Sequence, residues 1–165
     1  MKKFITINGC MGAGKTSVGK RVCDILGRSA FIDGDWCFDI HPFIGNSETK
    51  EMAIDNILHM SKNYFKCSEC DSVILSWIMS ERVVNRIISG LSGINFKIYN
   101  IVLTCNEETL EERWKKDNIT EWRNDENLIL AKKSITDFNN QTGCILIDTN
   151  NLSINNVANK IIEIL

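Results

Sequence analysis

The sequence has no apolar run close to the roughly 20 residues that a membrane-spanning helix needs. The apolar stretch at residues 4–7, behind Met1, Lys2 and Lys3, is also too short for the hydrophobic part of a secretion signal. Nor is positive charge in excess: the net charge is −2 at pH 7, which gives no overall field that attracts nucleic acids or anionic lipids. We therefore expect a cytoplasmic protein without a membrane or nucleic-acid partner.

The sequence also has almost no proline, no recognisable linker and no cysteine pattern typical of disulfides. Pro42 is the only proline, and there are no internal repeats or low-complexity tracts, so residues 1–165 are expected to form a single domain. The seven cysteines, an odd number scattered along the chain, do not suggest a disulfide framework. Cys67 and Cys70 form a C-x-x-C pair, but zinc normally needs a second pair of ligands, so we interpret them as small apolar residues.

Apolar runs of strand length alternate with segments of helical period. Near-continuous apolar runs, typical of strands buried on both faces of a parallel sheet, predict strands over residues 4–8, 30–33, 72–76, 97–104 and 144–148. Apolar spacings near 3.6 predict helices over residues 15–26, 47–65, 80–91, 106–116, 126–138 and 153–165, with N-caps at Ser47, Asn106 and Ser153. This alternation predicts a three-layer α/β/α fold with a five-stranded parallel sheet, which binds ligands at the carboxyl ends of its strands.

Residues 9–16 read GCMGAGKT, a complete G-x-x-x-x-G-K-[ST] pattern between a predicted strand and a predicted helix. Its glycines permit a tight backbone whose N–H groups point into one concavity and bind phosphate, helped by the positive end of the helix. Lys15 is expected to reach the β- and γ-phosphates, and the Thr16 hydroxyl to bind Mg²⁺. The predicted nucleotide-binding residues are Gly9, Cys10, Met11, Gly12, Ala13, Gly14, Lys15, Thr16 and Ser17. No Asn/Thr-Lys-x-Asp string for reading guanine is present, so ATP is favoured over GTP.

The stretch AFIDGDW, residues 30–36, places two carboxylates and a tryptophan where the second predicted strand ends. Asp33 and Asp35 share a face of an extended backbone, and Gly34 between them lets a ligand or a backbone segment approach closely. A carboxylate beside a bound γ-phosphate either holds Mg²⁺ through water or takes the proton from an attacking hydroxyl. A solvated Asp-Gly turn is the alternative, which the P-loop pattern nearby disfavours.

GCMGAGKT followed one strand later by DGD resembles the small P-loop kinases of the shikimate kinase, gluconate kinase and chloramphenicol phosphotransferase type, within the adenylate-kinase-like fold. The D-x-D-x-x-hydrophobic-acid string of shikimate-kinase-like enzymes is matched here by Asp33, Asp35, Phe38 and Asp39. The resemblance implies that Asp35 takes the proton of the acceptor hydroxyl and that Asp33 belongs to the magnesium site. Shikimate itself is disfavoured, because the glycine run after the third strand of shikimate kinases is replaced here by Ser76-Trp77.

Residues 113–123, RWKKDNITEWR, form a polar and basic segment between two predicted helices. In the kinases that the chain resembles, a short lid at this place, here about residues 113–124, closes over the phosphates and supplies arginines to the transferring group. The resemblance therefore implies that Arg113 or Arg123 contacts phosphate or adenine during catalysis. A solvated basic loop is the alternative.

Arginine is absent from residues 29–81, the region where shikimate and nucleotide kinases place arginines that clamp anionic acceptors. Carboxylates lie there instead, together with Trp36 and Trp77, which with Asp35 are the candidate residues of the acceptor pocket. This composition favours a neutral or cationic acceptor such as a nucleoside, sugar or antibiotic. We therefore predict an ATP- and Mg²⁺-dependent small-molecule kinase, a monomer or homodimer. The alternatives are an ATPase or nucleotide-binding module without an acceptor, and a nucleotide or shikimate-type kinase with an anionic acceptor.

Overall fold

The computed structural model describes residues 1–116 and 123–165. Its strands form one sheet and are β1 (Lys2–Gly9), β2 (Ser29–Asp33), β3 (Ser72–Ser76), β4 (Phe96–Thr104) and β5 (Ile145–Asp148). The spatial order is β2-β3-β1-β4-β5, and every neighbouring pair is parallel. The predicted five-stranded parallel sheet is therefore confirmed.

The helices also follow the predicted pattern, each bound differing from expectation by at most one residue. They are α1 (Lys15–Leu26), α2 (Ser47–Lys66), α3 (Glu81–Gly90), α4 (Glu107–Lys116), α5 (Asp125–Asn139) and α6 (Ile154–Ile164), with a short 3₁₀ helix η1 (Trp36–Phe38) after β2. In the part of the chain that the structure describes, we find no helix that is both long and apolar enough to cross a membrane.

Side chains at the helix starts bind the free backbone N–H groups there. Asn106 and Ser153 cap α4 and α6 as expected, each accepting a hydrogen bond from the N–H three residues on. The expected cap Ser47 is wrong. The cap of α2 is Asn46, whose side chain accepts from the Thr49 N–H at 3.0 Å while the Thr49 hydroxyl accepts from the Asn46 N–H at 3.1 Å. Thr49 thus occupies the capping-box position that is normally taken by glutamate or glutamine.

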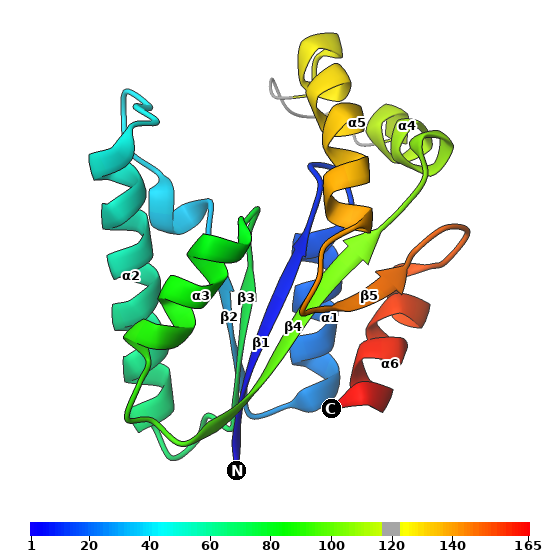
Figure 1. Ribbon diagram of the computed structural model, residues 1–165. Helices are drawn as coiled ribbons and strands as arrows, with labels where there is room; N and C mark the ends of the chain where they lie inside the picture. The colour runs from blue at the N-terminus through cyan, green and yellow to red at the C-terminus, as the bar shows by residue number, and fades with distance from the viewer. Residues whose placement is uncertain (117–122) are drawn as a thin grey trace.

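Two hydrophobic cores lie on the two faces of the sheet (Figure 1). Helices α1 and α6 pack together over one face, and this core includes Ile5, Ile7, Val22, Ile101 and Ile161. Helices α2 and α3 cover the other face, with a core that includes Phe4, Ile57, Val73, Leu75 and Ile87. Phe4 and Ile5 of β1 enter opposite cores because side chains alternate along a strand. This is the predicted three-layer arrangement.

The ends of the first three strands lie level with one another. Ile7 of β1 and Asp33 of β2 are both register partners of Ser76 in β3. The loop after β1, the carboxylates after β2 and the segment after β3 therefore meet at one edge of the sheet. Helices α4 and α5 stand beyond the carboxyl end of β4 on the same side (Figure 1).

Candidate active site

The loop between β1 and α1 has the backbone that a phosphate cradle requires. Gly9, Gly12 and Gly14 have φ angles of 144°, 84° and 92°, which L side chains rarely adopt. Gly14 is the last residue before α1, so the loop leads directly into the positive end of that helix. Residues 9–17, predicted to bind nucleotide, all lie in this loop and in the first turn of α1. The loop is therefore built to hold an anion.

The ammonium group of Lys15 lies within this loop. Its Nζ donates a 2.8 Å hydrogen bond to the carbonyl oxygen of Cys10, and the Ala13 N–H donates to the same oxygen at 3.2 Å. Burial lowers the pKa of Lys15 to about 8, while the Asp33 and Asp35 carboxylates oppose this effect. A phosphate bound in the loop would therefore meet a partly desolvated cation.

Thr16 and Asp33 bring a hydroxyl and a carboxylate together at the start of α1. The Thr16 hydroxyl donates to Oδ2 of Asp33 at 3.3 Å, and Oδ1 of Asp33 accepts from the Asp35 N–H at 3.1 Å. Such oxygen donors suit Mg²⁺, which commonly takes one or two protein ligands and completes its shell with water and phosphate. Across residues 1–116 and 123–165, no three His, Cys, Asp or Glu side chains gather into a metal site. The donor set thus fits a magnesium ion that arrives with a nucleotide.

Asp35 lies beside this pair. Desolvation raises the pKa of its carboxyl, and the negative charge of Asp33 raises it further. The positive charge of Lys15 and a hydrogen bond from the Trp77 side chain act in the opposite direction. Because the carboxylate is more basic than that of a solvated aspartate, it is a suitable acceptor for a proton.

Trp77 follows β3 and is mostly buried, with 9% of its surface exposed. Its ring lies directly against Gly34, because a Cβ atom on that glycine would be 2.2 Å from Cγ of Trp77. The absence of a side chain at Gly34 therefore leaves room for the indole ring of Trp77. The Trp77 side chain is also close enough to Asp35 to lower the pKa of its carboxyl, the smallest of the effects on that group. Contact between Trp77 and an acceptor stays a prediction.

We expect Gly34→Ala to destabilise the protein by about 1–3 kcal/mol, because the new methyl group overlaps the Trp77 ring and overpacking has costs of this size. Gly45→Ala is the matched control, since the nearest atom to a Cβ there is 3.4 Å away on the Phe43 ring. Urea denaturation of both variants measures the difference. Equal stability of Gly34→Ala and the wild type would contradict the packing described here.

Arg113, on α4, donates hydrogen bonds to two backbone carbonyl groups and to one side-chain hydroxyl. Its guanidinium group donates to the Ala13 carbonyl at 3.1 Å, to the Thr149 hydroxyl at 3.0 Å and to the Thr149 carbonyl at 2.8 Å. These bonds connect the P-loop to the segment after β5. In this arrangement Arg113 supports the cradle from outside, and its predicted contact with phosphate or adenine stays a prediction.

Arg123 lies closer to the phosphate cradle. Its guanidinium carbon is 4.5 Å from the ring centroid of Trp114, a stacked cation–π geometry. Its Nη1 atom is 3.1 Å from the place where a Cβ on Gly12 would lie, and its charge contributes to the lowered pKa of Lys15. Trp114 is buried, and its ring packs against this arginine. The centre of the predicted lid, residues 117–122, lies outside the described residues.

A buried asparagine that sequence reasoning missed joins the strand ends. Asn8, the residue before the P-loop, is fully buried. Its amide donates to the Met79 carbonyl at 2.7 Å, and its Oδ1 accepts from the N–H groups of Met79 and Gly9, each at 2.9 Å. These bonds attach the start of the P-loop to the segment after β3. A polar residue at the end of an otherwise apolar strand was the available signal.

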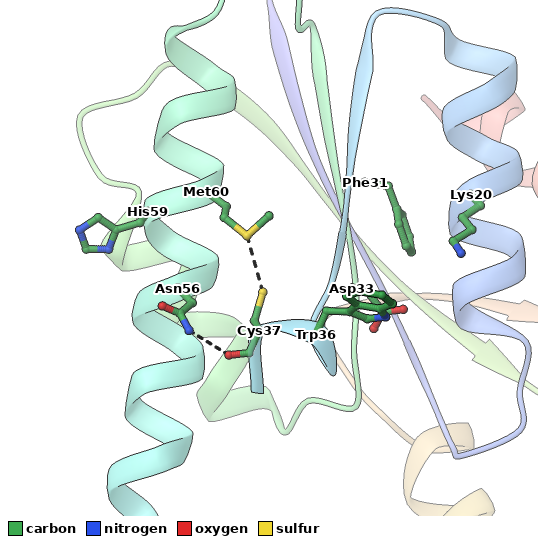
Figure 2. A pocket seen from close by; sticks show the side chains of 8 residues that line it. All are labelled: Lys20, Phe31, Asp33, Trp36, Cys37, Asn56, His59 and Met60. Carbon is green, nitrogen blue, oxygen red and sulfur yellow. Dashed lines mark hydrogen bonds between the residues drawn. The ribbon is translucent and has the colours of Figure 1, made fainter. Parts of the chain in front are cut away.

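A cavity of about 600 Å³ lies at the outer edge of β2, between α1 and α2 (Figure 2). Its walls come from these three elements and η1, and the lining residues are Lys20, Phe31, Asp33, Trp36, Cys37, Asn56, His59 and Met60. The Asn56 amide donates to the Cys37 carbonyl at 3.0 Å, and Cys37 Sγ is 3.8 Å from the sulfur of Met60. Trp36 is 82% exposed, and its contact with an acceptor stays a prediction. Sequence reasoning missed the α2 residues, because Met60 has the helical spacing of a core position.

A P-loop after β1, carboxylates after β2 and a parallel sheet of order 2-3-1-4-5 together define a small P-loop nucleotide-binding domain. A family model described as AAA domain matches residues 5–131. The chain therefore belongs to this AAA domain family. No curated protein sequence matches the chain.

Solved structures with the same fold include three kinases. A gluconokinase from Sinorhizobium meliloti 1021 is 15% identical, with 96% of this chain and 88% of that chain covered and a TM-score of 0.69. An APS kinase from Mycobacterium tuberculosis, in complex with AMPPNP and APS, is 15% identical with 98% and 96% covered and a TM-score of 0.65. A shikimate kinase from Acinetobacter baumannii, in complex with shikimate, is 18% identical with 99% and 92% covered and a TM-score of 0.61. The chain has the fold of the small P-loop kinases that its motifs resemble.

Proposed function

We propose that the protein transfers the γ-phosphate of ATP to a hydroxyl group of a small molecule, with Mg²⁺ as cofactor. The observation that supports this most is the contact of Thr16 with Asp33 beside Asp35. Oxygen donors for the metal and a second, more basic carboxylate thereby lie together next to the phosphate cradle. Hydrolysis alone would need a group that positions water, whereas this arrangement suits an acceptor hydroxyl.

Each residue has a distinct task in this mechanism. The P-loop N–H groups and Lys15 hold the phosphates, and Thr16 and Asp33 would hold Mg²⁺, which neutralises charge between the β- and γ-phosphates when bound. Asp35, whose pKa is raised, accepts the proton of the attacking hydroxyl. Arg123 stabilises the charge that develops on the transferring group. Transfer is in line and leaves no phosphate on the enzyme.

The cavity at β2 supports a neutral or cationic acceptor. Asp33 reaches it from the P-loop side, and within residues 1–116 and 123–165 no arginine lines it. Lys20, which does line it, lies with Nζ 6.0 Å from the ring centroid of Phe31. Arg86 of α3 forms an ion pair with Glu51 of α2. Aromatic faces and a carboxylate suit an apolar or cationic hydroxyl compound better than one that carries phosphate or carboxylate.

We expect neutral and cationic alcohols, such as nucleosides, sugars, amino-sugars and antibiotic alcohols, to give the higher kcat/KM in a screen of ATP consumption. The competing panel contains hydroxy acids and nucleoside monophosphates, whose negative charge meets Asp33 and no arginine. Phosphorylated product, identified by mass spectrometry, separates transfer from hydrolysis. A clear preference for the anionic panel would reverse the acceptor proposal, and ATP consumption without any product would support an ATPase.

A further inference from the structure

Two cysteines lie together beneath the P-loop. Cys10 is the second residue of the GCMGAGKT motif, and Cys105 directly follows β4. Each has 2% of its surface exposed, and their sulfur atoms are 4.0 Å apart. Neither is part of a disulfide, and the proposed phosphotransfer uses neither side chain.

The two thiols share one proton network and differ in acidity. The hydrogen bond from the Cys10 thiol lowers the pKa of Cys105 to about 7, and the positive charges of Arg113 and Lys15 add to this effect. Burial and the charge of Asp148 oppose it. The same contact raises the pKa of Cys10. Cys105 is therefore the more acidic thiol of the pair, and the thiolate is the reactive form of cysteine.

We propose that Cys10 and Cys105 form an oxidation site, at which a hydroperoxide produces a disulfide that distorts the P-loop and weakens nucleotide binding. This goes beyond phosphotransfer and does not require it. The sulfur atoms, 4.0 Å apart, are spaced as a reactive thiol and its resolving partner would be, and both lie buried under the P-loop.

The chemistry balances with one hydroperoxide per disulfide. The Cys105 thiolate attacks the peroxide, so that an S–O bond forms, the O–O bond breaks and an alcohol, or water from hydrogen peroxide, leaves after taking up a proton. The Cys10 sulfur then attacks the sulfenic acid of Cys105. The S–S bond forms, the S–O bond breaks, and the departing hydroxide takes the Cys10 proton and leaves as water.

We expect the disulfide to deform the cradle, because β1 and β4 beneath it are already paired neighbours in the sheet. A disulfide requires the sulfurs to close from 4.0 Å to about 2 Å. Gly9 and Leu103 are register partners, and a Cβ on Gly9 would already lie 2.7 Å from the Leu103 carbonyl oxygen. The movement therefore falls on Cys10 and on the segment after β4. The Cys10 carbonyl accepts the hydrogen bonds of Lys15 and Ala13, so its displacement moves the phosphate-binding groups.

Hydrogen peroxide treatment followed by calorimetry with ATP and Mg²⁺ tests the proposal. We expect the Kd for ATP to rise about tenfold or more, because displacements of about 1 Å in a binding site have effects of this size or larger. Dithiothreitol restores the affinity, and peptide mass spectrometry finds Cys10 linked to Cys105. Cys105→Ala and Cys105→Ser keep their ATP affinity after the same treatment.

Cys67→Ser is the matched control, since Cys67 is exposed and lies far along the chain from the P-loop. This variant should lose ATP affinity on oxidation as the wild type does. The proposal is overturned if the linked peptide does not form, if the linked protein binds ATP unchanged, or if the loss depends on Cys67 and Cys70. Because these measurements need no acceptor, a failure to find phosphotransfer does not affect their outcome.

Discussion

Lys15→Ala abolishes ATP binding and leaves the fold intact. The lysine head group lies in the P-loop on the Cys10 carbonyl, outside both hydrophobic cores, so its removal takes away phosphate contact without opening a cavity in the core. Calorimetry with ATP and Mg²⁺ measures the affinity, and circular dichroism and thermal unfolding check the fold. We expect no detectable binding and an unchanged helix and strand content.

Lys20→Ala is the control for this experiment. Lys20 lies on the same helix, is exposed and faces the β2 cavity, so its removal should leave ATP affinity close to that of the wild type. ATP binding by Lys15→Ala at wild-type affinity would contradict the assignment of the P-loop as the nucleotide site.

Asp35→Asn lowers kcat by about 10²–10⁴ and changes the ATP affinity much less. General-base catalysis contributes factors of this size, and an amide cannot accept the proton of the attacking hydroxyl. Asparagine has nearly the shape of aspartate, so the packing of Trp77 on Gly34 is retained. Steady-state kinetics with the best acceptor of the screen, together with calorimetry for ATP, separates the two effects.

Asp33→Asn is the matched comparison. Asp33 accepts the Thr16 hydroxyl, so its loss should raise the magnesium concentration needed for half-maximal activity. If Asp35→Asn kept near-full turnover while Asp33→Asn did not, the roles of the two carboxylates would be reversed.

The local parts of the site could be predicted from the sequence because their signals are local. The positions of the three glycines in the P-loop pattern predict where the backbone adopts positive φ, and the structure has positive φ at all three. The apolar runs and helical periods likewise predicted every strand and helix within two residues. Once the sheet was parallel, acidic residues at the end of β2 had to lie at the same edge of the sheet as the P-loop.

Contacts between distant residues could not be predicted in this way. Arg113 binds Ala13 and Thr149, and nothing in its neighbours along the chain indicates those partners. The same holds for Trp77 against Gly34, which depends on how the segments after β2 and β3 cross. Tryptophan at a strand end fits a ligand platform and a packing residue equally well until its burial is known.

The central place of β1 in the sheet determines when a newly synthesised chain can form its P-loop. Lys3 of β1 pairs with Ser72 on one side and with Lys97 on the other, so both neighbouring strands leave the ribosome long after β1. Pairing of such distant parallel segments is slow, because the intervening loops have to close first. The apolar β1 therefore stays unpaired during much of translation, and an exposed apolar strand of this kind is prone to aggregation. A nascent chain acquires a working P-loop only after β4 has been synthesised.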